Sequence, residues 1–112
     1  MSAAISSTVK NISHLLLLSQ EEVGSIVGTS ARTVSRWSTG EVEPQRSARE
    51  RLLELVYVGE QVSKVLEPES VNLWLFSPNE LLGADTPAER IRKGEFRSVL
   101  ALIEALADGV VV

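Results

Sequence analysis

Apolar residues recur every three or four positions along most of the chain, which is the spacing of one face of an α-helix. This spacing predicts a first helix over residues 8–18, a long amphipathic helix over 44–66 and a last helix over 95–107. Residues 1–7 are mostly small and polar, and we expect them to be frayed. Because we find no pair of segments with the alternation of paired strands, the sequence predicts an all-α fold.

The run over residues 19–37, SQEEVGSIVGTSARTVSRW, predicts two short helices joined by a tight turn. Ser19 and Glu22 have the spacing of a capping box at the start of the first helix. Gly24 would let the second helix pack closely, and Gly28 would let the chain turn through a left-handed conformation. This is the layout of a DNA-binding helix-turn-helix.

The second helix of this pair would present a polar face suited to DNA. Ser30 is placed to cap it, and Ala31, Val34 and Trp37 would face inward because they recur every three residues. The candidates for contact with base edges and phosphates are then Ser30, Arg32, Thr33, Ser35 and Arg36. The alternative interpretation is an ordinary helical hairpin with solvated arginines.

Charge is distributed unevenly along the chain, whose formal net charge is −4. Residues 1–50 carry five basic and five acidic side chains, whereas residues 51–112 carry six basic and ten acidic ones. Neutralisation of phosphates dominates affinity for DNA, so a single copy should bind weakly. We therefore expect DNA binding to need a dimer, a larger assembly or a basic partner.

Composition excludes several other classes of function. The chain has no cysteine, and hence no disulfide framework or thiolate zinc site. No run of apolar residues is long enough for a transmembrane helix. The N-terminal residues also lack the basic start of a signal peptide, so we expect a cytoplasmic protein. His14 is the single histidine, and no glycine-rich phosphate loop is present. We expect no catalysis, no cofactor, no metal and no small-molecule substrate.

The C-terminal half is punctuated by prolines and is rich in apolar residues. The segments 77–80 and 86–89 each combine a capping residue, a proline at the first helical position and a glutamate at the third. Trp74, Phe76 and the last helix are expected to form core, but about fifty residues cannot readily bury this much apolar surface. The excess suggests a protein interface as well.

Three valines, residues 110–112, follow Gly109 at the end of the chain. One interpretation is a frayed end, or a strap over the chain's own core. The other is an extended apolar plug with a terminal carboxylate, inserted into the cleft of another protein. The residues alone favour neither.

Four segments together give the chain a resemblance to a known family. They are EEVGSIVGTSARTVSRW, the turn GEVEPQR leading into ERLLELVYV, then NLWLFSPNELL, and finally GEFRSVLALIEALADGV. Over residues 21–112 the chain resembles the Xre/MbcA/ParS-type antitoxins, in which a helix-turn-helix precedes a small toxin-binding domain. Many repressors share the helix-turn-helix part, whereas the WLFSPN segment combined with the final one is far more specific.

The resemblance implies a domain for DNA binding over residues 1–58 and a helical toxin-binding domain over 59–112, joined by the long helix. It implies as partner a RES-domain toxin that consumes NAD, whose active site the antitoxin blocks, within an oligomeric complex that also binds operator DNA for autorepression. The implied toxin-binding residues are Trp74, Phe76, Phe96, Arg97, Gly109, Val110, Val111 and Val112. The alternative function is a stand-alone transcription regulator whose C-terminal half only dimerises.

Overall fold

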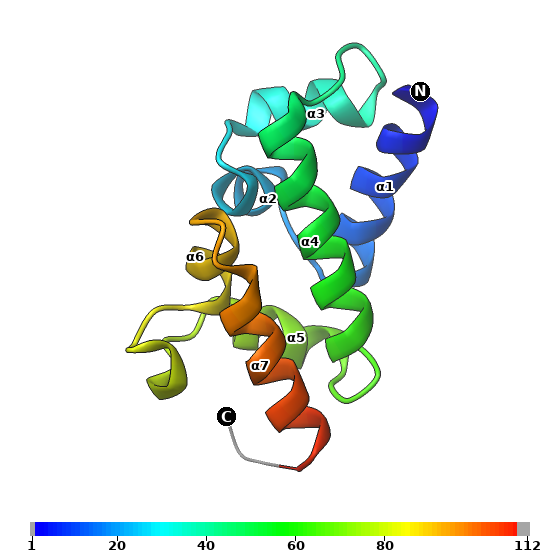
Figure 1. Ribbon diagram of the computed structural model, residues 1–112. Coiled ribbons are helices and arrows are strands. Elements are labelled where there is room, and N and C mark those ends of the chain that lie inside the picture. The colour runs from blue at the N-terminus through cyan, green and yellow to red at the C-terminus, as the bar shows by residue number, and fades with distance from the viewer. Residues whose placement is uncertain (1, 110–112) are drawn as a thin grey trace.

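Helices make up nearly all of the regular structure in residues 2–109, the part of the chain that the computed structural model describes (Figure 1). No strand occurs in these residues, which confirms the predicted all-α fold. The elements are α1 (Ser2–Leu15), α2 (Gln20–Val27), α3 (Ala31–Ser38), α4 (Arg46–Val62), α5 (Pro68–Leu75), the short 3₁₀-helix η1 (Glu80–Leu82), α6 (Pro87–Arg92) and α7 (Phe96–Ala107).

The predicted helix pair is present as α2 and α3, and its local signals act as expected. Ser19 Oγ accepts from the Glu22 N–H and Glu22 Oε1 accepts from the Ser19 N–H, both at 3.0 Å, so the capping box is complete. Gly28 ends α2 in the left-handed region with φ of 87°. A Cβ atom on Gly24 would lie 2.6 Å from the Thr29 carbonyl oxygen, so only glycine permits the close approach of the turn.

Two boundaries at the N-terminal end differ from the sequence prediction. Helix α1 begins at Ser2, so the expectation of frayed residues 1–7 is wrong for the described ones. Ile5 explains the difference, because its side chain is only 8% exposed and belongs to the core. The Ser6 hydroxyl also donates to the Ser38 carbonyl at the end of α3. The helix ends at Leu15 rather than at residue 18, and Leu17 takes a positive φ of 56°.

The long helix is shorter than predicted. Helix α4 has 17 residues and a length of about 26 Å at 1.5 Å per residue, because it begins at Arg46 and ends at Val62. Pro44 lies before the N-cap residue Gln45 and is therefore not in the first turn. Val65 lies beyond the helix and is half exposed, so it does not extend the buried stripe.

The two proline-containing caps of the C-terminal half behave differently. Thr86 forms a full capping box with Glu89 at the start of α6, as predicted. Ser77 caps no helix, because its hydroxyl donates to the Leu73 carbonyl at 2.6 Å and closes the end of α5. The capping group of η1 is instead Asn79, whose side-chain oxygen accepts from the Leu81 N–H at 3.0 Å.

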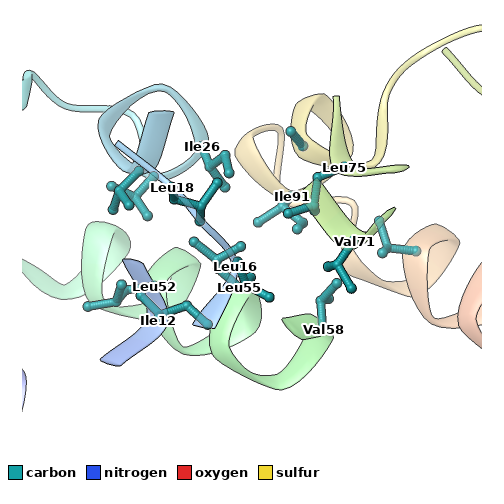
Figure 2. Close-up of a cluster of buried hydrophobic side chains, with 14 of the residues drawn as sticks. Ile12, Leu16, Leu18, Ile26, Leu52, Leu55, Val58, Val71, Leu75 and Ile91 are labelled. Atoms are coloured by element: carbon teal, nitrogen blue, oxygen red, sulfur yellow. The ribbon is translucent and has the colours of Figure 1, made fainter. Parts of the chain in front are cut away.

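The core runs without interruption through both predicted domains (Figure 2). Helix α4 is central, since it packs against α1, α2, α6 and α7. Its residues Leu52, Leu55, Val58 and Val62 are fully buried. Helix α2 also packs directly on α6, so the α2–α3 pair contacts the C-terminal half. The predicted division at residues 58/59 falls within α4, and the described residues form one elongated body of 42 × 24 × 20 Å.

Candidate functional site

Helix α3 separates a buried face from a polar outer face. Val34 and Trp37 are buried, and Ala31 is partly buried, in keeping with the inward positions expected from the spacing. The five candidate DNA-contacting residues lie at the outer face or its edge: Ser30, Arg32 and Arg36 are exposed, and Thr33 and Ser35 are partly exposed. Ser30 Oγ caps the helix by accepting from the Thr33 N–H at 3.2 Å.

The two arginines of α3 differ in whether a carboxylate lies close to them. Arg36 donates through Nε to the Glu41 carboxylate in the turn after α3, and both side chains are about half exposed. Arg32 has no carboxylate within 4.0 Å among the described residues. Arg46 and Arg49, at the start of α4, are each in an ion pair with a glutamate. The surface around α3 is therefore less cationic than its number of arginines suggests.

The described candidates for toxin contact do not form a single exposed patch. Trp74 is only 8% exposed and its indole Nε1 is buried without a hydrogen-bond partner, so it packs in the core. Phe76 and Phe96 are half-buried, and Phe96 meets Tyr57 edge to face with ring centroids 6.0 Å apart. Arg97 is exposed at the start of α7. Gly109 lies just beyond its end, and residues 110–112 lie outside the described residues.

A groove between α4 and α7 was not anticipated from the sequence. It encloses about 350 Å³ and is lined by Tyr57, Gln61, Leu100, Ile103, Glu104 and Ala107. Leu53, one turn before Tyr57 on α4, is also about half exposed. The signal in the sequence is that α4 carries more apolar residues than one buried stripe requires. The groove reaches the C-terminal end of α7, since Ala107, the last residue of that helix, lines it.

A cluster of charges secures the segment between η1 and α6. Asp85 Oδ2 accepts from Arg90 Nε and from Lys93 Nζ, both at 2.9 Å, and Arg90 Nη2 donates to the Leu82 carbonyl. The hydrogen bonds from Lys93 and Arg90 lower the pKa of the Asp85 carboxyl below its ordinary 3.8. The same contact with Asp85 raises the pKa of Lys93 above 10.5. The cluster fastens the η1 segment to α6.

The described residues provide neither a metal site nor a membrane-spanning helix. No group of three or more histidine, aspartate or glutamate side chains is placed to hold a metal ion in residues 2–109. Within the same range, none of the helices combines the length and the apolar character needed to cross a bilayer. The notable features of the described surface are thus the outer face of α3 and the groove between α4 and α7.

Comparison with known proteins identifies the family. No family model matches the chain. The mycobacterial cidal antitoxin MbcA of Mycobacterium tuberculosis H37Rv is 48% identical over 108 residues, which are 96% of this chain and 96% of that protein. The chain belongs to the MbcA antitoxin family. MbcA of Mycobacterium bovis matches equally well, and the probable mycobacterial cidal antitoxin Rv3188 is 31% identical over 96 residues, 85% of this chain and 81% of that protein.

A solved structure agrees in sequence and in fold. The crystal structure of the M. tuberculosis MbcT–MbcA toxin–antitoxin complex matches with a TM-score of 0.84 and 48% identity, over 96% of this chain and 96% of that one. The resemblance to the MbcA-type antitoxins inferred from the sequence motifs is therefore confirmed, and so is the helical architecture. The relative MbcA is named as an antitoxin, and the crystal structure contains it in complex with the toxin MbcT.

Proposed function

We propose that this protein is the antitoxin of a type II toxin–antitoxin system, that it blocks the active site of a RES-domain NAD-consuming toxin, and that it binds operator DNA through α3. The observation that carries the proposal is its 48% identity, over 96% of the chain, to an MbcA chain crystallised with the toxin MbcT. A binding protein of this kind is regulatory and performs no catalysis itself. Both proposed partners, the NAD-consuming toxin and the operator DNA, would be located in the cytoplasm.

The toxin-binding surface that we propose follows α7. Phe96 and Arg97 lie at its start, the groove between α4 and α7 runs along it, and Gly109 follows its end. Apolar side chains left in water at the groove would gain about 25 cal/mol for each Å² covered by a partner. Trp74 and Phe76 would support this surface from beneath by packing, because neither is freely exposed.

The blocking element that we propose is the segment after α7. Gly109, with φ of 84°, redirects the chain out of the helix. The three valines that follow it are an apolar peptide that could fill a cleft of the toxin, as the family resemblance implies. Deletion of Val110–Val112 should therefore raise the residual NAD turnover of the toxin in the complex.

The proposed operator contact uses the outer face of α3. Arg32 has no ion-pair partner in the described residues and is available to phosphate or base edges. The free chain has a net charge of −4, so binding would be strengthened when several copies are held together by the toxin.

The test is co-expression with the neighbouring gene, recording cell growth and the cellular NAD level with and without this chain. The full chain should preserve both. Ala107→Arg places a long cation in the groove and should weaken neutralisation and raise the Kd for the toxin. Ala101→Arg is the matched control, because Ala101 is exposed on the same helix but does not line the groove.

Each outcome has a distinct meaning. If the full chain fails to protect against any RES-domain neighbour, the proposed function is wrong. If it protects and both arginine variants inhibit equally well, the groove is not the toxin surface. If Ala107→Arg instead converts a dimer of the free chain into a monomer with neutralisation intact, the groove is a dimerisation surface and not the toxin surface.

A further inference from the structure

A second hollow lies where the helix-turn-helix meets the C-terminal half. It encloses about 500 Å³, is open to solvent, and is lined by Glu21, Gly24, Ser25, Gly28, Thr29, Ser30, Ala31 and Arg92. All of these except Arg92 belong to α2, α3 or the turn between them. Arg92 is the last residue of α6, which packs against α2 (Figure 1). The fold thus brings a cation that is far away in the sequence to the edge of the recognition helix.

Arg92 differs from the other cations of its segment in having no ion-pair partner. Arg90 and Lys93 are both bound to Asp85. Arg92 is exposed, and no carboxylate of the described residues lies within 4.0 Å of its guanidinium group. Glu21 lines the same hollow but makes no ion pair with it. The guanidinium group is therefore free to bind an external anion.

The position of the hollow indicates which anion. When a helix-turn-helix binds DNA, the N-terminal residues of the second helix meet base edges and the first helix crosses the phosphate backbone. The hollow lies at this junction, since it is lined by α2 residues, by the turn and by Ser30 and Ala31 at the start of α3. A backbone phosphate passing here would meet the hydroxyl groups of the turn and the guanidinium group of Arg92, which are the usual partners of phosphate oxygens.

We infer that Arg92 is a DNA-backbone contact supplied by the C-terminal half, so that the DNA-binding surface is a composite of α3 and α6. The inference rests on the proposed DNA binding through α3. Its role is to neutralise a phosphate, and it would therefore add affinity without sequence preference. It would add a positive charge from outside residues 1–50, whose net charge of zero by itself predicts weak binding.

The experiment measures binding of the full chain, in complex with its toxin, to a duplex from its own promoter region and to an unrelated duplex. For Arg92→Ala we expect a several-fold higher Kd on both duplexes. The slope of log K against log salt should become less negative by about 0.9, the loss of one phosphate contact. Arg92→Lys should recover most of the slope because it keeps the charge.

Lys64→Ala is the matched control. It removes the same charge from the C-terminal half, but Lys64 is exposed in the turn after α4, at the opposite end of that helix from α3. If Arg92→Ala and Lys64→Ala change the Kd and the slope equally, the inference is overturned, because only net charge matters.

The two proposals can fail separately. If the unmodified complex binds neither duplex, or if Arg32→Ala with Arg36→Ala leaves binding unchanged, then DNA binding through α3 is wrong. If that double variant abolishes binding with toxin neutralisation intact, while Arg92→Ala has no effect beyond its control, then only the contact from α6 is wrong.

Discussion

The substitution Gly24→Ala tests whether the α2–α3 pair depends on the close approach of its turn to α2. The new Cβ would lie 2.6 Å from the Thr29 carbonyl oxygen and 3.2 Å from the Ser30 carbonyl carbon. Ordinary contact begins at 3.4 Å, so the turn must move by about 0.8 Å, which is 3.4 minus 2.6. The atoms in the way are backbone, and they cannot rotate aside as a side chain could.

The expected magnitude is a balance of two effects. Replacing glycine by alanine within a helix contributes about 1 kcal/mol of stability, whereas overpacking a tight contact costs about 1–3 kcal/mol. Because backbone atoms must shift, we expect a cost near the upper limit and a net loss of about 2 kcal/mol. A loss of 1 kcal/mol lowers the Tm of a domain of this size by about 4 °C or more, so the expected decrease is about 8 °C or more.

The assay is thermal and urea unfolding followed by circular dichroism at 222 nm. Ser25→Ala is the control, since the neighbouring Ser25 is exposed on the same helix and should change stability by less than about 0.5 kcal/mol. If Gly24→Ala is as stable as Ser25→Ala, the reasoning is refuted, because the turn could then move away from α2 without cost.

Two further predictions concern charges that the structure pairs. Glu41→Gln should lower the Kd for DNA several-fold at low salt, because it frees Arg36 from a competing carboxylate. The control is Glu60→Gln, which removes an exposed charge on α4, and an equal decrease in Kd for this variant would contradict the prediction. Asp85→Asn should destabilise the fold at neutral pH, and in unfolding curves the difference from the unmodified chain should persist down to about pH 3.8 and shrink as the pH is lowered further, through the folded pKa of Asp85. The sign follows because the folded pKa of Asp85 lies below 3.8, so its contribution is present above that pH and is lost as the pH falls through the folded value.

The sequence predicted a helix cap correctly when the capping side chain had only one hydrogen-bond partner within reach. The capping box of Ser19 and Glu22 needs only the chain on either side of it, and the same is true of Thr86 and Glu89. Ser77 precedes a proline in the same pattern as Thr86, yet its hydroxyl donates to the end of the preceding helix. The pattern could not reveal this competition, because it depends on where α5 ends.

Hydrophobic spacing predicted which face of a helix is buried, but not what covers it. Trp37 and Val34 were correctly placed inward, and the outer face of α3 followed from them. The groove between α4 and α7 was missed because it depends on how two helices distant in sequence diverge. The ion pair of Arg36 with Glu41 and the position of Arg92 were missed for the same reason, since both depend on the path of the chain between helices.

The continuous core limits how the two proposed activities can be separated by mutation. Helix α2 packs on α6 and α4 is shared by both halves, so a substitution in the core would disturb the outer face of α3 and the groove between α4 and α7 together. Loss of both activities in such a variant would say nothing about whether the activities are linked. Surface variants such as Arg92→Ala and Ala107→Arg are informative because both positions are exposed and neither belongs to the core cluster. If Arg92→Ala weakens DNA binding and leaves toxin inhibition unchanged, α6 contributes to the DNA-binding face by position alone, without transmitting a change between the two faces.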